Sequence, residues 1–335
     1  MVFVTGGTGL LGSHLICELL KSGKSVKALK RSNSSMTWFN RVAIHLLKDE
    51  WTSCSQRLTW VDGDVLDIIS LIDAIEGCDS VYHAAAMVSF AKKDKDQLLK
   101  INVNGTANVI NACLSMTQRP KLCYISSTAS IGRVEKKTLD ESIAYSEESS
   151  NSFYSYTKYL AELEAYRGRE EGLDVAIINP CIILGFGNWN QGSVKFFKNG
   201  KSGFPFYTGG SNAFVDASDV ARASIVLMEQ ECFEERYLCV GWNLKYYNVF
   251  AQIAKEFGTK PPRILVRPWM AEFLWRIIGF YNFIAGTGII TKESARAGLR
   301  DTKYSSQKLI DKTGFAFTSF EDSVTNACDG YKTII

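Results

Sequence analysis

Short, mainly apolar stretches alternate with helical patterns along the first half of the chain. The apolar stretches are typical of strands buried on both faces of a sheet, and they lie at 2–4, 25–29, 58–61, 81–84, 122–126 and 175–178. Helical spacing follows the first of them, and further helices are predicted over 68–75, over 99–114 and in the segment that carries Tyr154. This order predicts βαβ units and therefore an α/β fold with a doubly wound parallel sheet.

The pattern changes beyond Pro180, where glycine-rich loops and clustered aromatic residues replace the clean alternation. We expect a Rossmann-type first domain of residues 1–180, to which 214–243 returns, and a smaller, interleaved substrate-binding domain of residues 181–213 and 244–335. The strand-like stretch 236–240 is expected to rejoin the main sheet.

Composition narrows the class of protein. The chain has 335 residues, 46% of them hydrophobic and 22% charged, which are ordinary globular values. The net charge of +3 is not gathered into basic runs, so nucleic acid is not an expected partner. Nine scattered cysteines without a CxxC spacing fit a reducing cytoplasm. We expect no signal peptide, because the first apolar run is too short and has no basic residues before it. Three widely separated histidines predict no metal site.

One apolar segment, residues 277–291, carries no charge. It is shorter than the roughly 20 residues of a spanning helix and is broken by glycines, so we interpret it as a buried element or a substrate lid. Peripheral membrane contact is the less favoured alternative.

A glycine-rich turn, Thr5-Gly6-Gly7-Thr8-Gly9-Leu10-Leu11-Gly12, lies between the first predicted strand and the first predicted helix. Glycines there let the backbone approach a pyrophosphate, which then sits at the positive end of the helix. A lone glycine motif is more often a plain turn, but this position between strand and helix is the one that dinucleotide binding requires.

The end of the second strand favours NADP(H) over NAD(H). It reads Lys27-Ala28-Leu29-Lys30-Arg31-Ser32, without the carboxylate that usually holds the ribose 2′-hydroxyl of NAD. Arg31 and Ser32 can bind a 2′-phosphate, although a solvated basic strand end is the alternative. After the third strand, Asp64 is either an acceptor for the adenine amino group or the N-cap of the next helix.

A catalytic constellation is predicted where two later elements meet. Tyr154 and Lys158 lie four residues apart and therefore on one helix face, where an ammonium group is expected to lower the pKa of the phenol. Ser127 follows the strand before that helix, at the sheet edge where α/β folds bind ligands, and a hydroxyl there can hold a substrate carbonyl.

Taken in order, these motifs resemble the extended short-chain dehydrogenase/reductase family, also called the NAD-dependent epimerase/dehydratase family. The resemblance runs essentially from end to end, through TGGTGLLG (5–12), GDVLD (63–67), VYHAAA (81–86), NVNGT (102–106), YISSTASIG (124–132), YSYTK (154–158), NPCIILG (179–185), FVDASDVARA (214–223) and YSSQKLIDKTGF (304–315).

The resemblance implies roles for individual residues. Ser127 would orient the substrate, Tyr154 would be the general acid/base, Lys158 would hold the nicotinamide ribose, and Asn102 would lie near that ribose. The cofactor would be bound by Gly6, Thr8, Gly9, Leu10, Leu11, Gly12, Arg31, Ser32, Asp64, Val65, Ala84, Ala85, Ala86, Tyr154, Lys158, Pro180, Ile182 and Ile183.

Two departures from the family pattern bear on the substrate. Asn179-Pro180 stands where Arg-Pro is usual, and Ile131 replaces the aromatic residue of the serine motif. The basic strand end resembles that of reductases of the dihydroflavonol reductase and cinnamoyl-CoA reductase type, which implies NADPH-dependent reduction of a ketone or aldehyde. The aromatic-rich second half suits a planar or apolar substrate better than a nucleotide sugar. The alternatives are a sugar-nucleotide epimerase or dehydratase, a hydroxysteroid-type dehydrogenase, and a non-catalytic NADP(H)-binding protein. The expected partner is a small-molecule substrate; homodimers are common in the family, but no residue here establishes one.

Overall fold

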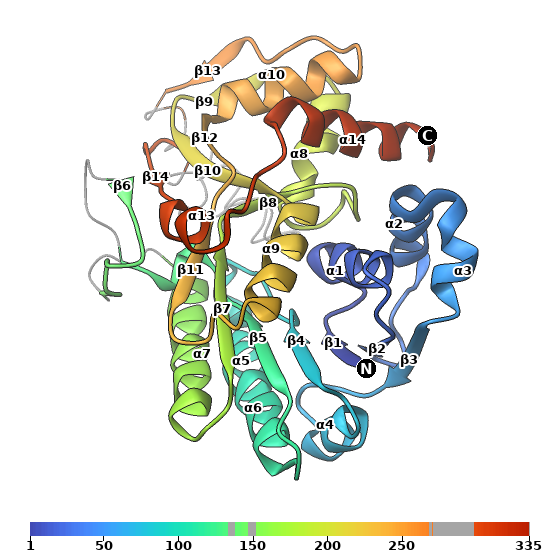
Figure 1. Cartoon of the computed structure of the whole chain (residues 1–335). Helices are drawn as coiled ribbons and strands as arrows, with labels where there is room; N and C mark the ends of the chain where they lie inside the picture. The colour runs from blue at the N-terminus through green and yellow to red at the C-terminus, as the bar shows by residue number, and fades with distance from the viewer. Residues whose placement is uncertain (133–137, 147–151, 268–269, 271–297, 335) are drawn as a thin grey trace.

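A seven-stranded parallel sheet in the order β11-β7-β5-β4-β1-β2-β3 is the centre of the fold (Figure 1). The computed structural model describes residues 1–132, 138–146, 152–267, 270 and 298–334. The strands of this sheet are β1 (Val2–Thr5), β2 (Val26–Lys30), β3 (Leu58–Asp62), β4 (Ser80–His83), β5 (Lys121–Ile125), β7 (Val175–Pro180) and β11 (Arg236–Cys239). The chain runs outward in one direction through β2 and β3 and in the other through β4 and β5, so the strand order reverses between β1 and β4. Ligands of open α/β sheets bind at such a switch point.

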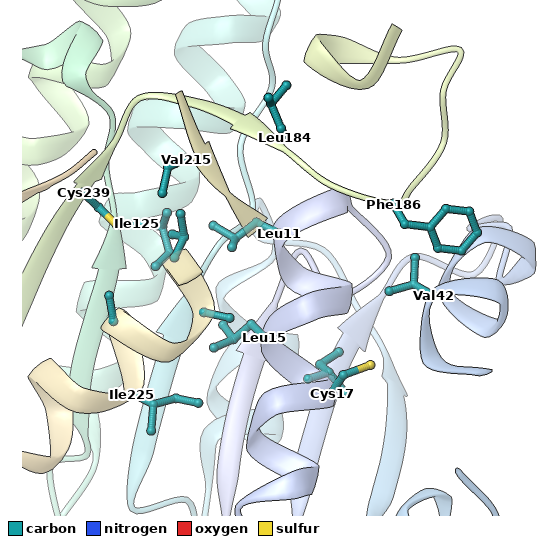
Figure 2. Close-up of a cluster of buried hydrophobic side chains, with 14 of the residues drawn as sticks. Leu11, Leu15, Cys17, Val42, Ile125, Leu184, Phe186, Val215, Ile225 and Cys239 are labelled. Carbon is teal, nitrogen blue, oxygen red and sulfur yellow. The ribbon is translucent and has the colours of Figure 1, made fainter. Parts of the chain in front are cut away.

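Helices cover both faces of this sheet because successive side chains of a strand point to opposite faces. Val2 and Val4 pack into one apolar cluster with α1 (Leu10–Lys21), whereas Phe3 between them packs into the cluster on the other face. The first face also carries α2 (Thr37–Leu47), α3 (Trp51–Ser55) and α9 (Ala217–Glu229), and the second face carries α4 (Ile68–Ile75), α6 (Gly105–Ser115) and α7 (Phe153–Glu170). Figure 2 shows the first cluster, in which Leu11 and Leu15 of α1 approach Ile125 and Ile225.

Smaller sheets lie outside the main sheet; in Figure 1 two of them are in the upper part and the sheet of β6 and β14 is at the left. One joins β8 (Ile182–Leu184), β10 (Ser211–Asp216) and β12 (Trp242–Lys245), and two-stranded sheets join β9 (Phe206–Thr208) to β13 (Ile264–Val266) and β6 (Thr138–Leu139) to β14 (Lys303–Tyr304). The remaining helices are η1 (Lys48–Glu50), η2 (Lys92–Asp94), α5 (Lys95–Leu98), η3 (Leu99–Asn104), η4 (Thr128–Ser130), η5 (Gly192–Val194), α8 (Lys195–Lys201), α10 (Tyr246–Glu256), α13 (Gln307–Thr313) and α14 (Phe320–Lys332).

The predicted α/β class and the predicted strands are confirmed, including the return of β11 to the main sheet beside β7. Two helices between β2 and β3 were not predicted, although α2 buries Phe39, Val42, Ala43 and Leu47 at helical spacing. The helix expected over 99–114 is divided into a π-helical turn, η3, and α6. The division into two domains stays a prediction, and the apolar segment 277–291 lies outside the described residues.

In the part of the chain that the structure describes, no helix combines the length and the apolar character needed to cross a bilayer.

Candidate active site

The glycine-rich turn leads from β1 directly into α1. Gly6 has a φ of 71°, in the region that favours glycine, and its carbonyl accepts a hydrogen bond from the Gly9 N–H at 2.9 Å. Helix α1 begins at Leu10, and no described side chain caps its first N–H groups; its first turn holds no acidic residue. These groups are therefore free to bind an anion at the positive helix end.

The turn lies against the segment that follows β4. A Cβ atom on Gly6 would lie 2.7 Å from the backbone N of Ala85, and one on Gly12 would lie 2.1 Å from the carbonyl oxygen of Gly6. Ala84 and Ala85 are partly exposed and Ala86 is exposed. The predicted cofactor residues of both segments thus meet at the switch point between β1 and β4, and the close backbone approach fits a dinucleotide.

The two basic residues at the end of β2, Lys30 and Arg31, differ in their contacts. Arg31 and Ser32 are exposed directly after the strand, whereas Lys30 is ion-paired at 2.6 Å with Asp62 at the end of β3. The sequence reading did not assign Asp62 a role; the parallel β2–β3 register brings it opposite Lys30. Arg31 is therefore the cation at this strand end that carries no ion pair in the described structure.

Asp64 is not a helix cap. Its Oδ1 accepts a hydrogen bond from the N–H of Leu66, and α4 is capped instead by Asp67, which accepts from Ile69 and Ser70. The N-cap interpretation of Asp64 is thus wrong, and its contact with adenine stays a prediction. Val65 is buried beside Gly105.

Ser127 and Tyr154 are brought together from β5 and α7. Ser127 caps the short helix η4, accepting a hydrogen bond from the Ala129 N–H at 3.1 Å, and Tyr154 lies in the first turn of α7, which Ser152 caps. Both side chains are partly exposed, and the ring of Phe90 meets the Tyr154 ring edge-on at 6.0 Å. Burial raises the pKa of the Tyr154 phenol, and a hydrogen bond with the Ser127 side chain acts against this rise in pKa.

The expected lowering of the Tyr154 pKa by Lys158 is not observed. The Lys158 ammonium donates hydrogen bonds to the Tyr124 hydroxyl at 2.8 Å and to the carbonyl oxygen of Ile125 at 2.9 Å. Its side chain is buried, and burial lowers the pKa of Lys158 to about 7, with Glu162 acting in the opposite direction. The i, i+4 spacing placed Lys158 and Tyr154 on one helix face, but β5 supplies nearer acceptors for the ammonium group.

This buried ammonium predicts a pH-dependent stability difference for Lys158→Met. The Lys158 pKa falls from 10.5 unfolded to about 7 folded, so below pH 7 the folded state carries a desolvated charge that destabilises it. Between pH 7 and 10.5 only the unfolded state keeps the proton, and the stability of the unsubstituted protein rises relative to the methionine variant. Urea unfolding of both proteins at pH 6 and pH 9 measures this difference; a difference that stays constant with pH would contradict it.

Asn102 lies in the π-helical turn η3 and is buried. Its side-chain amide accepts from the Met87 N–H at 2.7 Å and donates to the Met87 carbonyl at 3.0 Å and to Thr157 at 3.1 Å. The amide therefore joins the segment after β4 to α7 at Thr157, the residue directly before Lys158. π-Helical turns often occur at functional sites.

A buried network of hydrogen bonds, which was not predicted from the sequence, joins the ends of β1 and β4 to the helices η3 and α6. Ala85 N–H donates to Thr5 Oγ1, whose hydroxyl hydrogen bonds His83 Nδ1 at 2.7 Å, and His83 Nε2 hydrogen bonds Thr106 at 3.0 Å. Thr106 Oγ1 in turn donates to the carbonyl of Asn102. Burial lowers the pKa of His83 to about 3, so the histidine is neutral and joins the ends of β1 and β4. The only indication of this network in the sequence is that His83 lies within the VYHAAA motif.

The last predicted cofactor residues lie at the end of β7 and in β8. Pro180 is buried, whereas Ile182 and Ile183 are partly exposed and pair with Phe214 and Val215 of β10. This segment lies at the carboxyl end of β7, just as the glycine turn, Arg31 and Ser127 follow the carboxyl ends of β1, β2 and β5.

Residues 2–239 match the NAD dependent epimerase/dehydratase family. The chain is 31% identical to cinnamoyl-CoA reductase 1 of Petunia hybrida, over 78% of this chain and 78% of that protein. It is 28% identical to dihydroflavonol 4-reductase of Callistephus chinensis, over 99% of this chain and 86% of that protein.

Solved structures share the fold. The crystal structure of gox2253 superposes with a TM-score of 0.81 at 25% identity, covering 100% of this chain and 98% of that one. UDP-glucuronic acid 4-epimerase from Bacillus cereus in complex with NAD has a TM-score of 0.75 at 18% identity, covering 99% of each chain. From the sequence match and the shared fold, the chain belongs to the NAD-dependent epimerase/dehydratase family and is an NAD(P)-dependent oxidoreductase of the extended short-chain dehydrogenase/reductase type.

Proposed function

We propose that the protein is an NADPH-dependent reductase of a ketone or aldehyde. The observation that carries this proposal is the hydrogen bond between the Ser127 and Tyr154 side chains, which brings two hydroxyl groups together just after the carboxyl end of β5. A substrate carbonyl oxygen placed there could accept a hydrogen bond from both hydroxyls, and the phenol could act as the general acid. Relatives named cinnamoyl-CoA reductase and dihydroflavonol 4-reductase support the reductive direction.

In this proposal the hydroxyl residues of the site act on the substrate. When bound, the nicotinamide would supply a hydride to the carbonyl carbon. The Ser127 hydroxyl donates a hydrogen bond that orients the carbonyl oxygen, and Tyr154 transfers its phenolic proton to that oxygen. Lys158 supplies positive charge one helical turn away, and Asn102 keeps the segment after β4 in position.

The cofactor would lie along the switch point. Backbone N–H groups from Leu10 to Gly12 would bind the pyrophosphate, and Arg31 with Ser32 would bind the 2′-phosphate. Asp64 and Val65 would flank the adenine, Ala84, Ala85 and Ala86 the middle of the cofactor, and Pro180, Ile182 and Ile183 the nicotinamide end.

Arg31→Met is expected to raise the Kd for NADPH about tenfold and to leave the Kd for NADH unchanged, because a hydrogen bond to a charged group contributes about 1.5 kcal/mol or more. Fluorescence titration of each cofactor measures both constants. The matched control is Lys24→Met, which removes a surface cation from the turn after α1 and should change neither Kd. An equal loss for NADPH and NADH in the Arg31 variant would contradict the 2′-phosphate role.

The proposed function is tested by titrating the purified protein with NADPH and NADH and then assaying NADPH oxidation with a panel of ketones and aldehydes. Preference for NADPH and turnover of a carbonyl compound support it. NAD that stays bound through purification, together with conversion of a nucleotide sugar, would favour an epimerase or dehydratase instead. NADP(H) binding without turnover of any substrate class would favour a non-catalytic binding protein.

A further inference from the structure

A buried carboxylate, Glu162, lies one helical turn beyond Lys158 on α7. Its side chain is 2% exposed. One oxygen, Oε2, accepts hydrogen bonds from Ser126, from Ser130 at 2.6 Å and from the Asn179 amide at 2.6 Å. The other, Oε1, is ion-paired with the Arg236 guanidinium at 2.9 Å. Four side chains, from the turn after β5 and from strands β7 and β11, thus converge on this group.

All of these partners donate to the carboxylate. The Asn179 amide nitrogen and the guanidinium can only donate, and the two serine hydroxyls have Glu162 as an acceptor. Donors therefore surround both oxygens of the buried Glu162 side chain, and one of them, the Arg236 guanidinium, forms an ion pair with it.

The first group of donors encloses the predicted substrate-orienting serine. Ser126 and Ser130 lie on either side of Ser127 in the chain, and both donate to the same Glu162 oxygen. Asn179 also donates to the Ser127 carbonyl at 3.2 Å, and the Ser130 hydroxyl contacts that carbonyl at 2.8 Å. The backbone turn that carries Ser127 is therefore connected to the Glu162 carboxylate through the hydrogen bonds of Ser126, Ser130 and Asn179.

The Arg236 partner extends the cluster to the segment before α7. Its second guanidinium nitrogen donates to the carbonyl oxygens of Glu141 at 2.9 Å and Ile143 at 3.0 Å. The next residue, Ala144, lies against the serine turn, since a Cβ on Gly132 would be 1.9 Å from its carbonyl oxygen. The Glu162–Arg236 ion pair thus joins segment 140–144 to the turn that carries Ser127.

We propose that Glu162 is a positioning residue, whose carboxylate holds the Ser127 turn and segment 140–144 in place and supplies the negative charge that balances the Lys158 ammonium. This inference rests on the proposed function. Glu162 touches neither substrate nor cofactor in this proposal, and it acts through Ser127 and Lys158.

The charged groups around Lys158 determine how its pKa should change when Glu162 is replaced. The titratable groups that interact with its ammonium are Tyr124 of β5, His83 of β4 and Glu162 on the same helix. Burial raises the pKa of Tyr124 and lowers that of His83 to about 3, so both are uncharged at pH 7. Among the described residues, Glu162 raises the pKa of Lys158 against the effect of burial. Loss of its charge should lower the pKa of Lys158, which then loses its proton at a lower pH.

The test compares Glu162→Gln with Glu164→Gln on the same helix. Glu164 is ion-paired with Arg167 at 2.8 Å near the surface, so the control removes an equal charge outside the cluster. Glu162→Gln is expected to lower kcat about tenfold or more and to move the alkaline limb of the pH profile down by about one pH unit, which corresponds to a tenfold change in proton affinity. Glu164→Gln should do neither, and Glu162→Asp, which keeps the charge, should restore the alkaline limb.

A second measurement separates this inference from the proposed function. If the unsubstituted protein reduces no carbonyl compound, the proposed function is contradicted, and the pH dependence of NADPH binding, followed by nicotinamide fluorescence, still reports the titration of Lys158. The alkaline loss of binding should begin at lower pH in Glu162→Gln than in Glu164→Gln.

If Glu162→Gln does not fold, Glu162→Asp is compared with the unsubstituted protein. The shorter aspartate side chain makes longer contacts to the serine turn, which should lower kcat without moving the alkaline limb. Unchanged kcat, or an alkaline limb that does not move when the Glu162 charge is removed, would overturn the inference.

Discussion

Replacing Tyr154 with phenylalanine is expected to lower kcat for carbonyl reduction by about three orders of magnitude, because general acid catalysis contributes between about 10² and 10⁴. The substitution removes only the hydroxyl that would protonate the substrate oxygen, and it leaves the ring and its edge contact with Phe90. The Kd for NADPH should therefore change less than about threefold. Steady-state kinetics and fluorescence titration measure the two effects separately.

Tyr156→Phe provides the matched control for this prediction. Tyr156 lies two residues further along α7 and points away from the Tyr154 face, because residues two apart do not share a helix face. We expect wild-type kcat for that variant. A Tyr154→Phe protein that turns over at the unsubstituted rate would rule out the proposed acid, and an equal loss in both variants would indicate damage to α7 instead.

Replacing Gly12 with alanine is expected to weaken NADPH binding about a hundredfold, which corresponds to about 3 kcal/mol. The added Cβ would lie 2.1 Å from the Gly6 carbonyl oxygen and 2.9 Å from the Gly7 Cα, so the backbone of the turn must move. No flexible side chain can give way there, and overpacking of this kind costs about 1–3 kcal/mol. The displaced turn would no longer present its N–H groups to the pyrophosphate.

The control for this substitution is Gly209→Ala. A Cβ there would meet only the Leu265 side chain at an ordinary 3.5 Å, and Gly209 lies far along the chain from the turn, between β9 and β10. That variant should bind NADPH normally. A circular dichroism melt of both proteins checks that the fold is retained, and undiminished NADPH affinity in a folded Gly12→Ala protein would contradict the assignment of the turn.

The strands and the glycine turn were predictable because their signals are local. A strand buried on both faces must be apolar along its whole length, as at Val2–Thr5 and Val175–Pro180, and that run is visible in the sequence. The Thr5–Gly12 turn is equally local, since close backbone contacts between neighbouring residues require glycine there. Helix α2 carried the same kind of signal at Phe39, Val42, Ala43 and Leu47, but it was missed.

The sequence also placed Tyr154 and Lys158 on one helix face, which follows from the periodicity of a helix alone. It could not show which acceptors the Lys158 ammonium would take. The Tyr124 hydroxyl and the Ile125 carbonyl come from β5, 34 and 33 residues away, and their approach depends on how α7 packs on the sheet. The expected effect of Lys158 on the Tyr154 pKa was wrong for that reason.

By itself the sequence therefore determined the fold class, the glycine-rich turn between β1 and α1 and the spacing of the hydroxyl and amine groups, because each depends on residues close together in the chain. Only the tertiary structure decided which distant side chains share the interior. Thr5 meets His83 across 78 residues and Glu162 meets Arg236 across 74, and these contacts set the charges and hydrogen bonds around the site. Such pairs arise from the order in which the strands join the sheet and from the packing of α7 on it, and both depend on contacts between residues far apart in the chain.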